Sequence, residues 1–207
     1  MSLGGRIFAA MYDRMSAGSE KAGLADHRRV LLAGAHGRVL EIGAGTGTNL
    51  EYYGDGVEEL TVVEPLAPMA RRLERRAGEL GRPIELVRAP AEDLPFADDS
   101  FDVVVSTLVL CTVGDVPKAL AEMRRVLKPA GRLLFIEHVR ADDAGLARKQ
   151  DRMNRINRVV AYGCNCNRET VEAIRGAGFA IERLEHDRLQ KVPSFVSPLV
   201  VGSAEAG

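Results

Sequence analysis

The fold is decided by a short apolar run that ends in three glycines, Val39-Leu40-Glu41-Ile42-Gly43-Ala44-Gly45-Thr46-Gly47-Thr48-Asn49. Apolar and β-branched residues at 38–42 predict a buried strand, and a helical stretch is expected after the loop. Glycine lets the backbone turn tightly and approach a ligand at positions where a Cβ atom would collide. A strand, a glycine loop and a helix in this order predict a nucleotide-type binding turn, and the alternative is a plain glycine-rich turn.

The spacing of these glycines separates two classes of ligand. A dinucleotide-binding loop is G-x-G-x-x-G/A, in which the third small residue lets the helix pack closely on the strand. Counting from Gly43, that third position is Thr48, and the actual spacing is G-x-G-x-G. Glu41 stands two positions ahead, where its carboxylate would repel a pyrophosphate and favour a sulfonium cofactor that carries a protonated amine. The loop therefore favours S-adenosylmethionine over NAD.

Strand and helix patterns alternate outward from this loop. Short apolar runs predict further strands at 59–64, 84–87, 101–106 and 132–137, with helices at 67–80 and 117–127 between them. The less regular last third predicts a polar helix at 144–162, a helix from an Asn167 N-cap to about Gly176, and strands at 181–185 and 195–201. Pro193 and Pro198 favour an edge position for the last strand. The expected fold is α/β, a Rossmann-like doubly wound sheet of seven mostly parallel strands with helices on both faces.

Bulk composition agrees with one globular domain. The chain has 207 residues, 46% hydrophobic and 28% charged, and a net charge of −1, which gives the molecule as a whole no attraction for nucleic acid or an acidic membrane. The opening segment has a helical stripe that includes Ile7, Phe8 and Met11, and Gly18 and Gly23 are expected to interrupt it before a second helical run that ends at Leu32. The apolar stretch at 7–11 is too short for a leader or a membrane span.

The cysteines point to a reducing compartment. There are three, an odd number, so free thiols and a cytoplasmic location are expected. Cys164 and Cys166 are separated by one residue, whereas structural zinc sites use C-x₂₋₄-C pairs and four ligands. No metal is therefore expected.

Several segments together resemble the class I methyltransferases. The run 41–47 is similar to their first motif, 99–104 to the approach to their fourth strand, and 127–132 to the turn before the fifth. The segment 89–96 resembles the adenine-framing segment of the quinone-biosynthesis type. Pro90 departs from the family, which often has an acidic residue there. Proline offers neither a carboxylate nor an N–H, so adenine recognition is expected to rest on the Ala91 backbone and Glu92.

The resemblance, which covers 38–138, implies S-adenosyl-L-methionine as cofactor. Glu64, at the end of the second strand, is expected to hold both ribose hydroxyls. Tyr12-Asp13 resembles a pair that closes over the cofactor, although Tyr12 fits a core position equally well. The full set of implied cofactor-binding residues is Tyr12, Glu41, Gly43, Ala44, Gly45, Asn49, Glu64, Pro65, Ala91, Glu92 and Thr107. The single domain then divides into a helical lid (1–35), a cofactor-binding core (36–140) and acceptor-side helices and final strands (141–207).

Three further segments, 106–113, 136–139 and 163–170, resemble the methyltransferase-like thiol S-methyltransferases and their bacterial relatives. The expected acceptor is a small, apolar molecule with a thiol, hydroxyl or ring-carbon nucleophile, and no nucleic acid or integral membrane segment is expected. Ligands in open α/β sheets sit at the carboxyl ends of strands, which places His138 near the reacting methyl as a candidate base. Glu137 is the rival base. The alternatives are a quinone- or lipid-pathway methyltransferase and a cofactor-binding protein without catalysis.

Overall fold

The computed structural model describes residues 3–207, with side chains described from residue 9 onward, so the expected contacts of Ile7 and Phe8 lie outside the described side chains. The strands are β1 (Gly37–Ile42), β2 (Val57–Val63), β3 (Glu85–Val87), β4 (Phe101–Thr107), β5 (Leu127–His138), β6 (Phe179–Arg188) and β7 (Pro198–Ala206). The helices are α1 (Leu3–Ser19), α2 (Ala25–Leu32), α3 (Ala67–Leu80), α4 (Val116–Val126), α5 (Ala144–Val160) and α6 (Thr170–Gly176), with a π-helical turn at Glu20–Leu24 and a 3₁₀ turn at Thr48–Glu51.

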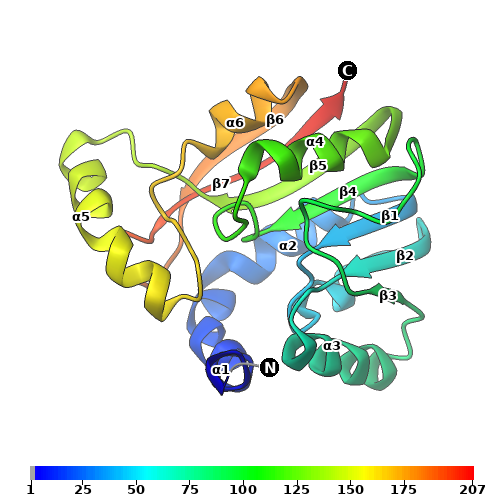
Figure 1. The fold of residues 1–207 in the computed structure, drawn as a ribbon, viewed down its shortest axis with the longest axis horizontal. Helices are drawn as coiled ribbons and strands as arrows, with labels where there is room; N and C mark the ends of the chain where they lie inside the picture. Colours follow the sequence, from blue (N-terminus) through cyan, green and yellow to red (C-terminus); the bar gives the residue numbers. More distant parts are fainter. Residues whose placement is uncertain (1–2) are drawn as a thin grey trace.

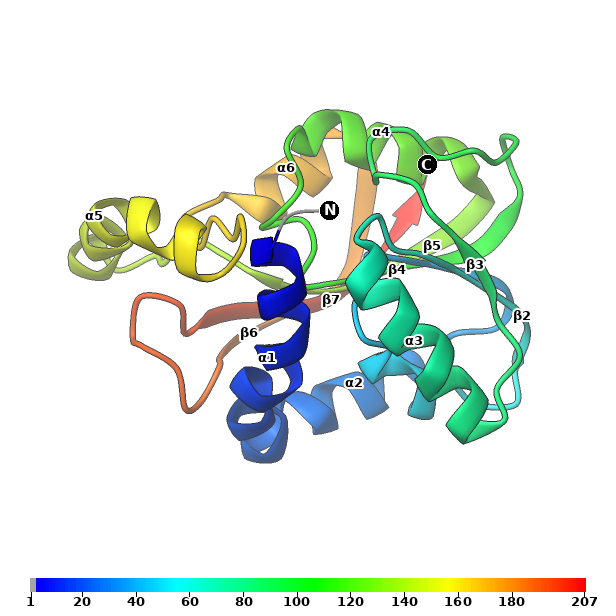
Figure 2. The same cartoon turned by 60° about the horizontal axis from the view of Figure 1, so that its bottom comes forward.

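The seven strands form one sheet in the order β3-β2-β1-β4-β5-β7-β6, and the prediction of a doubly wound, mostly parallel sheet is confirmed (Figure 1). Only β7 runs antiparallel to its neighbours, β5 and β6. Helices α2 and α3 cover one face and α4 and α6 the other (Figure 2). Because β1 and β4 are adjacent and their chain connections diverge, a crevice opens at their carboxyl ends, where such sheets bind ligands.

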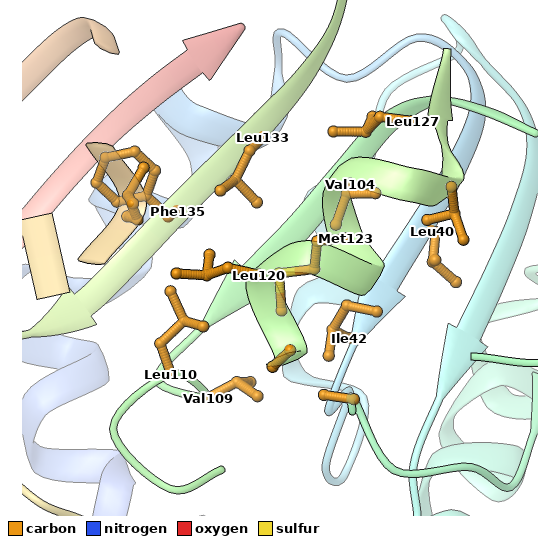
Figure 3. Packing of buried hydrophobic residues seen from close by; sticks show 14 of the residues in the cluster. Leu40, Ile42, Val104, Val109, Leu110, Leu120, Met123, Leu127, Leu133 and Phe135 are labelled. Atoms are coloured by element: carbon orange, nitrogen blue, oxygen red, sulfur yellow. The ribbon is translucent and has the colours of Figure 1, made fainter. Parts of the chain in front are cut away.

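Each face of the sheet has its own apolar core. On the α4 face, Leu120 and Met123 pack over Val104, Leu133 and Phe135, all of them buried (Figure 3). On the opposite face, side chains from α2 and α3 pack against the alternate positions of β1, β2, β4 and β5. Parallel strands buried on both faces read as continuous apolar runs, which explains why the sequence located β1, β2, β4 and most of β5.

The predicted edge position of the last strand is wrong. β7 lies between β5 and β6 and is therefore not an edge strand. Pro198 is its first residue, a position where a missing N–H is tolerated within a sheet. Gly202 then sits beneath Phe135, and a Cβ atom there would lie 2.5 Å from Cζ of that ring. The strand fits inside the sheet because its proline stands at the first position of the ladder, opposite Arg188, and its glycine makes room for the core.

Local boundaries also differ from the predictions. Of the two predicted interruptions of the opening helix, the one at Gly18 is wrong because α1 continues through it, whereas the break does come at Gly23, which has φ of 130°. Asn167 is not the N-cap of α6, because the helix begins at Thr170 and Glu169 is its N-cap; the Asn167 amide donates to Asp151 at 2.9 Å. The glycine loop leads into the short 3₁₀ turn Thr48–Glu51 rather than a long helix.

Candidate cofactor site

The glycine loop bends away from the end of β1 through left-handed backbone conformations. Gly43 and Gly45 have φ of 60° and 61°, which only glycine adopts without strain. A Cβ atom on Gly43 would lie 2.7 Å from the Val109 side chain, so this glycine makes room for the β4 exit. A Cβ on Gly45 would meet no atom nearer than 3.9 Å. Gly45 therefore presents backbone to open space, as a cradle for a closely held ligand requires.

Glu64 joins the two elements that enclose this space. It follows β2, and its carboxylate accepts hydrogen bonds from the Gly45 N–H at 2.9 Å and from the Leu66 N–H at 2.8 Å. Leu66 is the N-cap of α3, so the carboxylate also lies at the positive end of that helix. Burial raises the pKa of Glu64 above its ordinary value, and the two N–H groups oppose that rise.

A cavity of about 300 Å³ lies between these elements at the carboxyl ends of β1, β2 and β4. Seven of the predicted cofactor-binding residues line it. They are Tyr12, Gly43, Gly45, Glu64, Pro65, Ala91 and Glu92. The remaining wall is mostly apolar. It comes from the ends of β1 and β2, the start of α3, the segment after β3, the segment after β4 and the residues that follow α5; it includes Ile42, Val63, Leu66, Met69, Ala89, Leu108, Val109, Val113, Ala161 and Tyr162.

The other four predicted cofactor-binding residues do not line this cavity but lie behind it. Glu41 accepts hydrogen bonds from Asn49 Nδ2 at 3.0 Å and from Tyr53 Oη at 2.8 Å. Asn49 Nδ2 also donates to Thr107 Oγ1 at 3.1 Å. Burial raises the pKa of Glu41 to about 7. Ala44 is buried too, and its carbonyl accepts from the Gly47 N–H. These residues form a polar layer that supports the glycine loop.

Helix α1 also contacts the glycine loop. Asp13 Oδ1 accepts a hydrogen bond from Thr46 Oγ1 at 2.5 Å, and Asp13 Oδ2 lies 3.7 Å from Arg72 of α3. These contacts hold α1 across the cavity, where Tyr12 lines the wall. Desolvation by burial raises the pKa of Tyr12 to about 12, so its hydroxyl stays protonated at neutral pH. Tyr12 therefore lines the cavity, and the closing role of the Tyr12-Asp13 pair stays a prediction.

The segment expected to frame adenine also borders the cavity. Pro90, Ala91 and Glu92 all line it, but Glu92 Oε1 already accepts from the N–H groups of Gly114 at 2.7 Å and Asp115 at 3.2 Å. Asp115 is the N-cap of α4. Glu92 therefore connects this segment to the start of α4. A ligand would be bound by the lone pairs of the Glu92 carboxylate that these two hydrogen bonds do not use.

Glu137 is completely buried and holds the segment after β4. Its Oε1 accepts hydrogen bonds from Ser106 Oγ at 2.7 Å, the Val109 N–H at 3.0 Å and the Leu110 N–H at 3.1 Å. Leu108, within this turn, has φ of 58°, a strained conformation for a side chain of its size. Burial raises the pKa of Glu137 to about 7. The sequence identified Glu137 only as a rival base, whereas the structure gives it a positioning role for the cavity wall.

His138 is not among the residues that line the cavity. Its side chain is buried, desolvation lowers its pKa to about 4, and hydrogen bonds with the backbone of Pro198 and Val196 oppose that shift. The imidazole is therefore neutral but faces the start of β7. Its role as a base stays a prediction, and this placement favours a structural role.

The cysteines are all buried and free, and Cys111 and Cys164 are hydrogen-bonded to each other. That hydrogen bond and burial raise the pKa of Cys111. Within the described part of the chain, no three histidine, cysteine or acidic side chains are grouped as a metal ion would require. Cys164 lies in the segment after α5, and all three thiols belong to the protein interior.

Comparison with known proteins identifies the family to which the chain belongs. A methyltransferase-domain model matches residues 40–135. The human thiol S-methyltransferase TMT1B is 37% identical over 182 residues, which are 84% of this chain and 73% of that protein. The ubiquinone/menaquinone biosynthesis C-methyltransferase UbiE of Escherichia coli is 35% identical over 148 residues, 66% of this chain and 59% of that protein. A solved S-adenosylmethionine-dependent methyltransferase of Thermotoga maritima matches with a TM-score of 0.72 and 25% identity, over 98% of this chain and 97% of that one.

With this fold, this glycine loop and these relatives, the chain belongs to the class I S-adenosylmethionine-dependent methyltransferases, in the family that includes the thiol S-methyltransferases. Within residues 3–207, no helix combines the length and the apolar character that a membrane span requires.

Proposed function

We propose that the cavity holds S-adenosylmethionine and that the enzyme methylates a small, apolar acceptor, with a thiol as the preferred nucleophile. In this proposal 1–35 cover the site, 36–140 hold the cofactor and 141–207 complete the acceptor side. We also place the enzyme in the cytoplasm, where buried thiols stay reduced. The cradle at Gly45 and the carboxylate of Glu64 fit a ligand with a polar, partly cationic end.

The observation that carries the choice of acceptor is the composition of the cavity wall. Apart from the carboxylates of Glu64 and Glu92 and a few hydroxyl groups, the side chains that line it are apolar. Both lining carboxylates, Glu64 and Glu92, already accept backbone N–H groups, and Tyr12 is protonated at neutral pH. When bound, the cofactor supplies an activated methyl group for direct displacement. An acceptor that ionises by itself needs the least help from such a wall, and a thiol with pKa of about 8.5 does so more readily than an alcohol.

A methyl-transfer screen tests the proposal. Purified protein is incubated with isotope-labelled S-adenosylmethionine and matched apolar thiols, phenols, quinols and amino-lipids, and products are read by mass. We expect methylation of the thiols, with a rate that rises as pH approaches about 8.5 because the thiolate is the nucleophile. Methylation of quinols alone would favour the quinone-pathway alternative, which the similarity to UbiE supports. No product with any acceptor, although the cofactor binds, would favour the non-catalytic alternative.

The same screen includes His138→Ala. We expect its turnover to stay within about threefold of wild type, because a general base contributes about 10²–10⁴-fold and His138 does not line the cavity. Its melting temperature should fall because the backbone groups at the start of β7 lose their partner. A loss of about 10²-fold or more with unchanged cofactor affinity would restore His138 as the base.

A further inference from the structure

Large apolar side chains are exposed mainly at one place on the molecule. Among residues 9–207, seven large apolar side chains are exposed, and five of them belong to α1 or α5. These five are Met11, Met15, Ile156, Val159 and Val160, and we call them the rim. Val159 is 81% exposed and Val160 63%. Single exposed apolar side chains are ordinary, but a cluster of them marks an interaction surface.

The rim borders the entrance of the cofactor cavity. Tyr12, Ala161 and Tyr162 line the cavity. Met11 comes directly before Tyr12 in the chain, and Val160 directly before Ala161. Figures 1 and 2 show the last turns of α5 beside α1 in both views. The two helices that carry the rim therefore each contribute, directly or through the residues that follow, to the wall of the cavity.

Basic side chains share the outward face of α5 with the rim. At about 100° per residue, Arg148, Arg152, Arg155, Ile156 and Val159 fall within an arc about 100° wide. The opposite side of the helix carries its buried residues, Ala147, Gln150 and Asn157. The arginines lie mainly toward the start of this face, and the apolar side chains are at its end, next to the cavity.

The positive charge of this face is not neutralised by the protein. Within the described residues, Arg148, Arg152 and Arg155 form no ion pair, whereas the one acidic residue of α5, Asp151, is paired with Arg140 at 2.7 Å. The net charge of −1 for the whole chain thus conceals a basic surface.

From these observations we propose that the outward face of α5 and the rim dock on an anionic lipid bilayer. A helix with basic and apolar side chains on one exposed face has the composition of helices that lie in the membrane interface. The arginines complement anionic headgroups, and Ile156 and Val159 enter the boundary with the acyl chains. A symmetric contact between two copies would instead bring unpaired arginines toward each other, which is unfavourable. Docking in this way opens the cavity toward the phase in which an apolar acceptor is most concentrated.

Vesicle sedimentation tests this proposal without reference to the reaction. We expect the full chain to sediment with phosphatidylcholine vesicles that contain phosphatidylglycerol, less with phosphatidylcholine alone, and less at high salt because ions screen the attraction. Arg152→Gln should lower partitioning about fivefold, since each basic residue near an anionic surface contributes on that scale. Val159→Asp should lower it further, because it removes an apolar contact and adds a like charge. Leu80→Asp, an exposed apolar position on α3, is the matched control and should bind as wild type does.

Two results would overturn the proposal. One is sedimentation that is absent, or equal for Val159→Asp and Leu80→Asp. The other is a dimer in light scattering that Val159→Asp dissociates, because the face would then join two copies of the chain. Melting temperature and cofactor titration verify that each variant is folded, so a failure of the proposed acceptor chemistry does not affect this test.

Discussion

Glu64→Ala will lower the affinity of the protein for S-adenosylhomocysteine at least tenfold. Hydrogen bonds to a charged group contribute about 1.5–3 kcal/mol each, so the loss of one is enough for that effect. The structure adds a second cause. Glu64 accepts the N–H groups of Gly45 and Leu66, and alanine would release the glycine loop from the start of α3. Because both of these bonds are internal to the protein, the melting temperature will fall as well.

Calorimetric titration and a thermal melt measure the two effects of Glu64→Ala. Glu59→Ala is the matched control, because Glu59 lies on the same strand but is exposed and pairs with Arg38. The control should keep wild-type affinity. If Glu64→Ala binds the ligand as tightly as wild type, Glu64 does not contact the cofactor.

The second large effect is expected at Glu137. Glu137→Ala leaves the Ser106 hydroxyl and two backbone N–H groups buried without an acceptor, at a cost of about 1–3 kcal/mol each. Cofactor affinity should fall too, because Val109 in this turn packs against Gly43. Glu137→Gln keeps an acceptor oxygen at the same place and should restore most of the affinity. Equal losses in both variants would contradict a positioning role.

The pH dependence of Glu137→Gln has a definite sign. Burial raises the pKa of Glu137 from 4.5 to about 7. The folded state therefore binds more protons than the unfolded state between these values, so this contribution to stability is present below pH 4.5 and is lost as pH rises through 7. Glutamine has no such dependence. The stability of Glu137→Gln relative to wild type should thus increase from about pH 5 to pH 8 in denaturant titrations, whereas parallel curves would show that Glu137 keeps its ordinary pKa. Glu41 and His138 titrate in both proteins and cancel in the comparison.

The sequence predicted the sheet and the cofactor end of the site because both depend on local patterns. Continuous apolar runs mark strands buried on both faces, and the G-x-G-x-G spacing marks the turn between β1 and the cavity. Gly43, Gly45 and Glu64, which were predicted to bind the cofactor, line the cavity. The position of β7 inside the sheet depends on how Gly202 and Phe135 fit together, and a contact between distant residues leaves no local signal.

The roles of Glu137 and His138 were harder to predict. Their position at the end of a strand places them at one edge of the sheet, but it does not show toward which face of the sheet each side chain points. Side chains alternate along β5, so Phe135 and Val139 belong to the α4-side core, whereas Leu134 and Ile136 belong to the other. Glu137 therefore faces the turn after β4, and His138 the opposite side. Glu41, Asn49 and Thr107 were predicted to bind the cofactor, but hydrogen bonds from Asn49 to the other two hold them behind the cavity wall.

The most direct test of cofactor binding in the cavity is a calorimetric titration of the wild-type protein with S-adenosylmethionine, S-adenosylhomocysteine and NAD. The central claim is that the cavity between Gly45, Glu64 and Tyr12 holds the adenosyl cofactor. We expect both adenosyl ligands to bind at one per chain and NAD to give no response. Binding of NAD with no response to either adenosyl ligand would contradict it.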